Sequence, residues 1–281
     1  MPIPAEDRVL PQPRSTGTDA LLPVRIWRGD ANGRFERYDV PRHASQTVLD
    51  VVSHVQRHVD ATLAYRYACR VGMCGSCAMT VNGKARWTCR THVDAVVGAA
   101  TLEIAPLNHL PIVRDLVVDM APFADRQRRV GAAFAPAPAA PPYAEIPSAS
   151  AERQAIDDAI ECIGCAMCLS ACTMVAANAR FPGPAALNRA FTVQRDRRDA
   201  AHETRWATLL SEEGLTRCHG QASCTDVCPM GLSPTDSILR LRRMAVRRMV
   251  SGRDGARLKA AQVGSSGGGT DGASRANSLP G

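Results

Sequence analysis

Eleven cysteines in a chain of 281 residues constrain its fold and chemistry more than any other feature. An odd number cannot all pair as disulfides within one chain, and the N-terminal region lacks the apolar segment that directs proteins into an oxidising compartment. No stretch offers the ~18 consecutive apolar residues that a membrane-spanning helix needs. We therefore expect a chain located in the cytoplasm, whose thiols bind metal.

The first group of cysteines has the spacing C-x4-C-x2-C followed by a later fourth residue: Cys69, Cys74, Cys77 and Cys89. This spacing is typical of plant-type [2Fe–2S] sites. Gly72 and Gly75 lie within the loop and allow backbone N–H groups to approach the sulfides. Zinc is the alternative, but four-cysteine zinc sites usually consist of two C-x2-C pairs, and the first gap here is four residues. The spacing predicts a [2Fe–2S] cluster.

The second group, C-x2-C-x2-C-x3-C, has the spacing of bacterial ferredoxins: Cys162, Cys165, Cys168 and Cys172. The third group repeats this spacing incompletely, because Gln221 stands where a second cysteine would fall among Cys218, Cys224 and Cys228. In two-cluster ferredoxins the fourth cysteine of each run binds the other cluster. The spacing therefore predicts a [4Fe–4S] cluster held by Cys162, Cys165, Cys168 and Cys228.

Three cysteines then remain for a further cluster: Cys172, Cys218 and Cys224. A cubane that lacks one thiolate readily lacks the iron at that corner, so we expect a [3Fe–4S] cluster. The alternative is weak ligation by the Gln221 oxygen, which would give a labile [4Fe–4S] cluster. On either reading all eleven cysteines bind metal.

The charge of the chain is basic, with a formal net value of +7. A basic chain can bind nucleic acid or an anionic membrane. Aromatic residues are only 4%, however, and no pattern of base-stacking or helix-turn-helix residues accompanies the arginines, so we expect no nucleic acid partner. A non-catalytic zinc protein remains the alternative from a different class, and a brown iron–sulfur preparation would exclude it.

Composition predicts five segments along the chain. The α+β region is expected to hold two strands around the turn at 30–33, a helix capped by Thr47 and a hairpin at Asn82-Gly83. Helices are expected at 152–161, from 183 onward, at 205–210 and at Pro234–Val250. The segments are a loose leader at 1–21, an α+β domain at 22–122, an extended Pro/Ala-rich connector at 123–150, a helical domain at 151–250 and a disordered tail at 251–281.

Several local strings resemble the iron–sulfur subunit of the succinate dehydrogenase and fumarate reductase family. They are CRVGMCGSCAM (69–79), NGK (82–84), VVDM (117–120), CIGCAMC (162–168), FPGPAAL (181–187) and CPMGLSP (228–234). The resemblance covers residues 22–250 and implies an α+β fold, in which a β-grasp [2Fe–2S] ferredoxin domain precedes an α-helical ferredoxin domain. It also implies an oxidoreductase subunit that passes electrons through [2Fe–2S], [4Fe–4S] and [3Fe–4S] clusters, without a catalytic residue of its own.

The resemblance further implies the partners. They are an FAD-containing dehydrogenase or reductase subunit, membrane anchor subunits that carry haem b in some complexes, and quinone. The expected location is peripheral, on the cytoplasmic side of the inner membrane, within the respiratory chain. Succinate oxidation is the expected reaction of the complex. Fumarate reduction, or service to another flavin-dependent dehydrogenase, is the alternative.

His219, next to Cys218, matches a family position near the quinone. The resemblance implies that it donates a hydrogen bond or proton to quinone, or a hydrogen bond to a haem propionate. The alternatives are a hydrogen bond close to the cluster, or simple exposure. The run Thr-Met-Val-Ala-Ala at 173–177 lacks the proline and aromatic residues that many members have there. The type of quinone and its contacts therefore stay open.

Overall fold

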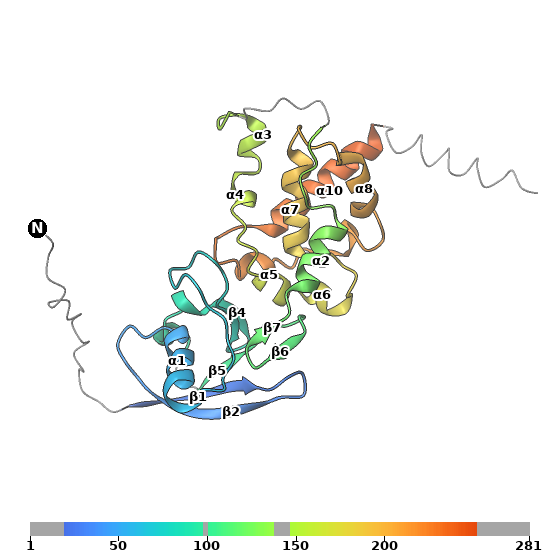
Figure 1. The fold of residues 1–281 in the computed structure, drawn as a ribbon. Coiled ribbons are helices and arrows are strands. Elements are labelled where there is room, and N and C mark those ends of the chain that lie inside the picture. Colours follow the sequence, from blue (N-terminus) through green and yellow to red (C-terminus); the bar gives the residue numbers. More distant parts are fainter. Residues whose placement is uncertain (1–19, 98–100, 138–146, 252–281) are drawn as a thin grey trace, which may run out of the picture. The chain divides into compact units, whose positions relative to one another are not determined.

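The computed structural model describes residues 20–97, 101–137 and 147–251 (Figure 1). The expected leader and tail, and the middle of the expected connector, fall on residues outside these ranges, apart from the residues that border them. Residues up to Ile238 form one compact unit, and the contacts described below lie within it.

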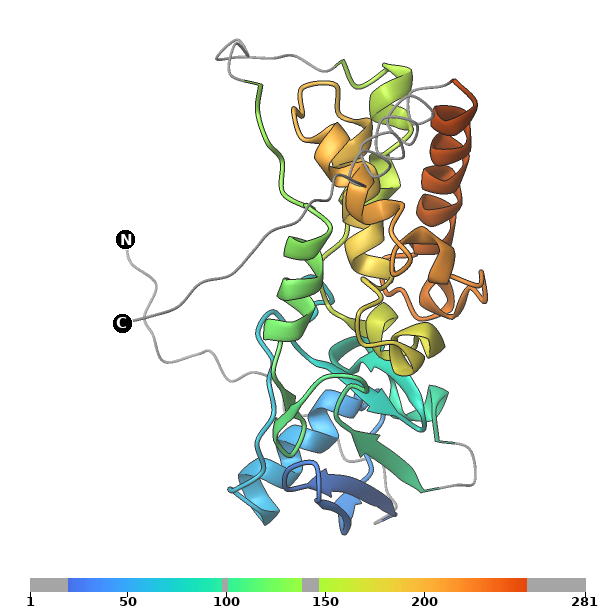
Figure 2. The same cartoon turned by 90° about the vertical axis from the view of Figure 1, so that its right-hand side faces the viewer.

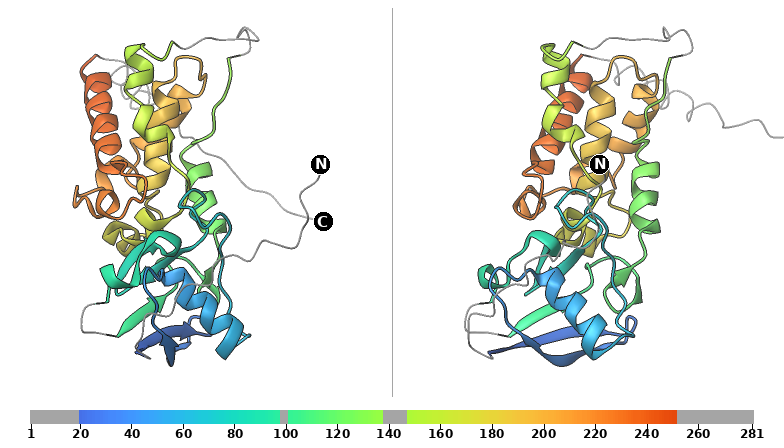
Figure 3. Two further views of the ribbon diagram at one scale, coloured as in Figure 1. Left: turned by 90° about the vertical axis from the view of Figure 1, so that its left-hand side faces the viewer. Right: turned by 60° about the vertical axis from the view of Figure 1, so that its left-hand side comes forward.

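The N-terminal part is a curved sheet that holds one helix. The strands are β1 (Leu21–Arg28), β2 (Arg34–Pro41), β3 (Ala78–Val81), β4 (Lys84–Trp87) and β5 (Leu102–Ala105). Their order is β2-β1-β5-β3-β4, with β1 and β5 parallel and the other neighbours antiparallel. Helix α1 (Val48–His54) supplies Val48 and Val52 to a core that includes Val24, Ile26 and Ile104. This is the expected β-grasp arrangement (Figure 3).

Helix α1 begins where the sequence predicts. The Thr47 hydroxyl accepts a hydrogen bond from the Asp50 amide at 3.2 Å, and the Asp50 carboxylate accepts one from the Thr47 amide at 3.0 Å. The α-helical part ends at His54, because the following turn, Val55–Val59, is π-helical. The Asp60 amide reaches the Val55 carbonyl, five residues back, and so widens this turn.

Smaller elements complete this part of the chain. They are the 3-10 turns Thr88–Arg90 and Val93–Ala95 and the two-stranded sheet of β6 (Ile112–Arg114) and β7 (Val117–Val118).

Helices make up the rest of the described chain. They are α2 (Ala121–Arg129), α3 (Ala151–Gln154), α4 (Asp157–Ile160), α5 (Met167–Ser170), α6 (Thr173–Ala177), α7 (Pro184–Arg195), α8 (His202–Leu209), α9 (Ser223–Asp226) and α10 (Pro234–Val250), with a 3-10 turn at Leu215–Arg217. In the described residues no helix is both long and apolar enough to cross a membrane.

Two expectations about these helices need correction. The region 152–161 is two short helices rather than one, because Ile156 has a non-helical backbone (φ −120°). The first residues of the expected extended connector belong to α2. Pro122 lies in the first turn of α2, where a missing N–H costs no hydrogen bond, so the proline favours a helix here.

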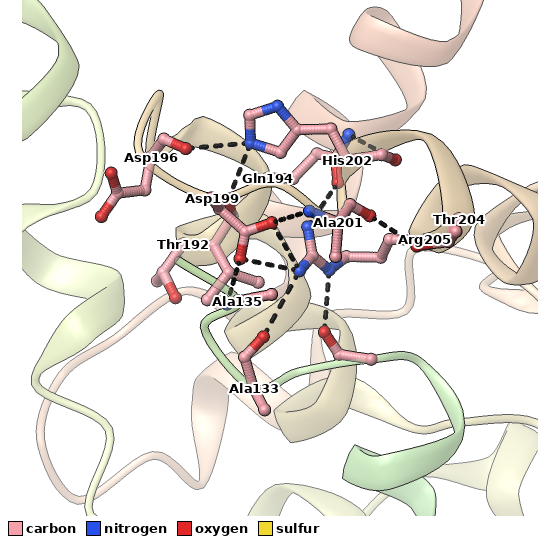
Figure 4. A network of polar contacts seen from close by, with 12 residues as sticks. Ala133, Ala135, Thr192, Gln194, Asp196, Asp199, Ala201, His202, Thr204 and Arg205 are labelled. Atoms are coloured by element: carbon pink, nitrogen blue, oxygen red, sulfur yellow. Dashed lines mark hydrogen bonds and ion pairs between the residues drawn. The ribbon is translucent and has the colours of Figure 1, made fainter. Parts of the chain in front are cut away.

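Helix α2 leads out of the sheet and runs beside the buried α7 (Figure 2). The segment after α2 is fixed by Arg205 of α8, whose side chain is fully buried with that of Asp199. The Arg205 guanidinium binds the Asp199 carboxylate at 3.0 Å (Figure 4). It also donates a hydrogen bond of 2.8 Å to the Gly131 carbonyl. The Asp199 carboxylate also accepts a hydrogen bond of 3.0 Å from the Ala135 amide. This buried ion pair therefore connects the post-α2 segment to α8.

Candidate metal centres

Three cysteines of the first group, Cys69, Cys74 and Cys77, lie in the loop that precedes β3. The Cys69 sulfur accepts hydrogen bonds from the Met73 and Cys74 amides, both at 3.3 Å. These bonds and one from the Val71 amide lower the pKa of the Cys69 thiol to about 6. Burial and the neighbouring Cys77 raise the pKa of Cys89 to about 11, and the charge of Cys69 acts in the same direction. The fold thus brings Cys89, which follows β4, to the loop that holds the other three.

The second group draws together residues from two distant parts of the chain. Burial raises the pKa of Cys168 well above its usual value, and the charges of Cys165, Cys162, Cys224 and Cys228 raise it further. Burial likewise raises the pKa of Cys165 to about 11, with a contribution from Cys162 and Cys228. Cys228, from the end of α9, therefore lies with the three cysteines of the 162–168 loop.

The third group lines one pocket of the helical part. Cys172, Cys218 and Cys224 all border it, together with His219 and Gln221. Burial raises the pKa of Cys224, and so do the charges of Cys172 and Cys218. The Thr173 hydroxyl donates a hydrogen bond of 2.5 Å to the Gln221 side-chain oxygen, and both Gln221 and His219 are solvent-exposed.

The loops of the second and third groups have the same local backbone conformation. Gly164 and Ala166 have positive φ angles of 66° and 63°, and Gly220 and Ala222 have 72° and 61°. In each loop the left-handed alanine precedes a four-residue helix, α5 or α9, that carries a cysteine. By this correspondence Gln221 occupies the position that Cys165 has in the other loop.

The donor set fits iron–sulfur clusters. Neighbouring buried thiols cannot all ionise unless bound cations offset the repulsion between the resulting thiolates. The iron of a cluster supplies that positive charge. Backbone amides already point at several sulfurs, such as the Gly164 amide at Cys162 and the Met174 and Val175 amides at Cys172. In the described residues no three His, Cys, Asp or Glu side chains are placed to hold a single metal ion, so the case for clusters of several irons rests on the groups of thiols.

The loops of the first two groups touch. A Cβ atom added at Gly75 would lie 2.5 Å from Cys165 Cβ and 3.1 Å from Cys165 Cα. Nearby, the Asn108 amide donates a 2.8 Å hydrogen bond to the Ser170 hydroxyl of α5. The sheet domain and the first helical loop are therefore in van der Waals contact at the point where the two sets of thiols approach each other.

Sequence reasoning missed two residues at these sites, Thr235 and Arg126, and it missed the contact that Gly75 makes. The Thr235 hydroxyl lies 3.2 Å from Cys224 Sγ, Gly75 contacts Cys165, and the buried Arg126 donates a hydrogen bond to the carbonyl of Phe181 in the wall of the third pocket. Thr235 follows the Cys-Pro segment closely, so its position was a usable signal. Arg126 is one of many arginines, and nothing in the sequence distinguishes it from the others.

Comparisons with known proteins agree with this description. A model of the 2Fe-2S iron-sulfur cluster binding domain matches residues 23–125, and a model of the 4Fe-4S dicluster domain matches residues 158–232. The succinate dehydrogenase iron-sulfur subunit of Paracoccus denitrificans is 34% identical over 85% of this chain and 93% of its own length. The fumarate reductase iron-sulfur subunit of Mycobacterium tuberculosis is 33% identical over 75% of this chain and 85% of its own length.

Solved structures agree as well. A chain of the Mycobacterium smegmatis Sdh1 complex in the apo form superposes with a TM-score of 0.73 at 26% identity, covering 82% of this chain and 98% of that one. With this fold, these groups of thiols and these relatives, the chain belongs to the family of succinate dehydrogenase and fumarate reductase iron–sulfur subunits.

Proposed function

We propose that the three groups of thiols hold the three clusters of an electron-transfer chain. In this assignment a [2Fe–2S] cluster is held by Cys69, Cys74, Cys77 and Cys89, a [4Fe–4S] cluster by Cys162, Cys165, Cys168 and Cys228, and a [3Fe–4S] cluster by Cys172, Cys218 and Cys224. The observation that carries the assignment is the matched pair of loops, because Gln221 stands in the third group where Cys165 stands in the second. The domains that hold these groups are residues 22–122 and 151–250.

When bound, the clusters accept and release single electrons at iron without any bond to substrate. The chain itself supplies thiolates, amides directed at the sulfurs and burial, which together set the potential of each site. The contact between Gly75 and Cys165 keeps the first two sites close together. The protein therefore acts by position and electrostatics.

We further propose which faces meet the partners. Val71 and Met73 lie in the first cysteine loop and are 60% and 62% exposed, so this loop presents two neighbouring apolar side chains to a partner. This face fits the FAD-containing subunit, which delivers electrons. The face around the third group, where His219 is exposed at the rim of the pocket, is the one we propose to meet the membrane anchor, and His219 would donate a hydrogen bond to quinone there. The chain would then lie peripherally, on the cytoplasmic side of the membrane.

Electron paramagnetic resonance of the assembled complex tests this proposal. Succinate added without oxygen should produce the signal of a reduced [2Fe–2S] centre and remove that of an oxidised [3Fe–4S] centre, and a soluble quinone should reverse both changes. Signals that respond to dithionite but not to succinate would contradict the proposed donor. Signals reduced by succinate but not reoxidised by quinone would contradict the proposed acceptor.

Fumarate reduction is the second candidate, because one of the relatives is a fumarate reductase subunit. The same complex decides between the two directions. Faster turnover with fumarate and a reduced quinol than with succinate and quinone would favour the second candidate.

A further inference from the structure

Arg126 in α2 carries a buried positive charge. Arg126 is only 7% exposed, although guanidinium groups are rarely buried without an anionic partner. Its hydrogen bond goes to the carbonyl oxygen of Phe181, which is a neutral acceptor. Within the described residues no carboxylate forms an ion pair with it, so its positive charge calls for a counter-ion of another kind.

The position of Arg126 indicates what that counter-ion is. Phe181, whose carbonyl it binds, is 1% exposed and forms part of the wall of the pocket bordered by Cys172, Cys218 and Cys224. Burial and the charge of Arg129 lower the pKa of Arg126, whereas the charge of Cys172 raises it. The guanidinium is therefore bonded to a residue in the wall of the pocket that the three thiols border.

Three thiolates and four sulfides outweigh the charge of three ferric ions, so the proposed cluster is anionic before reduction and more so after it. A fixed positive charge nearby stabilises the state with the added electron more strongly. We propose that Arg126 is the counter-charge of the three-thiolate cluster and raises the reduction potential of that cluster. This inference rests on the proposed function, because it needs the cluster at Cys172, Cys218 and Cys224.

The chain offers a matched control on the same helix. Arg129 donates a hydrogen bond of 3.4 Å to the carbonyl of Arg180, the residue next to Phe181. Unlike Arg126, Arg129 is exposed. Replacing either arginine by glutamine removes one positive charge and keeps an amide donor. Water and salt screen the exposed charge, so only the buried one should act strongly on the cluster.

A redox titration of the assembled complex, followed by electron paramagnetic resonance, tests the inference. With Arg126→Gln, the ratio of reduced to oxidised three-iron cluster at a fixed potential should fall by at least about tenfold, which equals about 59 mV for one electron. Arg129→Gln should leave the ratio close to wild type, Arg126→Lys should restore most of the loss, and the [2Fe–2S] midpoint should not move in any variant.

Equal midpoints of the three-iron cluster in Arg126→Gln and Arg129→Gln would overturn the inference while leaving the proposed function intact. A wild-type complex without a three-iron signal would instead refute the proposed ligands and this inference together. If Arg126→Gln does not assemble, Arg126→His decides. Its three-iron midpoint should lie below wild type at pH 8, where the imidazole is neutral, and approach wild type at pH 6. A midpoint equal to wild type at both pH values would overturn the inference.

Discussion

Replacing Gly75 by alanine should separate the first two cluster loops. Gly75 has a φ angle of 70°, and the new methyl carbon would lie 2.5 Å from Cys165 Cβ, 3.1 Å from Cys165 Cα and 3.3 Å from Ile163 Cδ1. Non-bonded carbon atoms prefer a separation of about 3.5–4.0 Å. Because the nearest atom is the Cβ of a fixed cysteine, the loops must move apart by about 1 Å to relieve this contact.

Gly83 provides the control for this substitution. It has a φ angle of 76°, and an added Cβ atom would meet nothing within 4 Å. Alanine at either position incurs the left-handed backbone cost, roughly 1–2 kcal/mol. Only Gly75→Ala adds the cost of overpacking, typically about 1–3 kcal/mol. The difference in stability between the two variants therefore isolates the contact between the loops.

Two measurements on the assembled complex check this prediction. Thermal unfolding should show a lower midpoint for Gly75→Ala than for Gly83→Ala, with both below wild type. In the reduced complex, the magnetic interaction between the [2Fe–2S] and [4Fe–4S] centres should weaken in Gly75→Ala alone, because dipolar coupling falls steeply with distance. Equal stability and equal coupling in the two variants would refute the argument that the loops touch through Gly75 and Cys165.

Three further outcomes are expected. Arg205→Met leaves the Asp199 carboxylate buried and unpaired, so the free energy of unfolding, measured with denaturant, should fall by about 3–5 kcal/mol. An unchanged free energy of unfolding would show that the pair is not buried. Thr235→Val removes the hydroxyl beside Cys224, so the three-iron midpoint should fall in a redox titration and return with Thr235→Ser, whereas an unchanged midpoint would exclude that hydrogen bond. Met73→Glu should weaken the binding of the flavoprotein subunit without altering any cluster signal, and undiminished binding would exclude this face as the docking site.

Much of the fold could be predicted because its signals are local. The Thr47 cap, the Asn82-Gly83 hairpin and the cysteine spacings each depend on residues close together in the sequence, and the structure has the cap and the hairpin where they were expected. The assignment of individual cysteines to clusters stays a prediction, although the thiols gather in the expected groups.

The features that sequence reasoning missed depend on tertiary contacts. Composition made residues 123–150 look extended, but the first of them belong to α2, whose first turn accommodates Pro122 and which packs beside α7. The contact of Gly75 with Cys165 joins two domains, so no local pattern carries it. The burial of Arg126 depends on the same packing of α2, and an arginine-rich sequence conceals it.

The central claim is that the third group of thiols holds three irons because Gln221 stands at the fourth corner. Electron paramagnetic resonance of the oxidised complex tests it most directly, with wild type and Gln221→Cys measured side by side. We expect a three-iron signal in wild type, and its loss in Gln221→Cys together with a new signal of a [4Fe–4S] centre on reduction. Wild type without the oxidised three-iron signal, or a Gln221→Cys variant that keeps it unchanged, would contradict the claim.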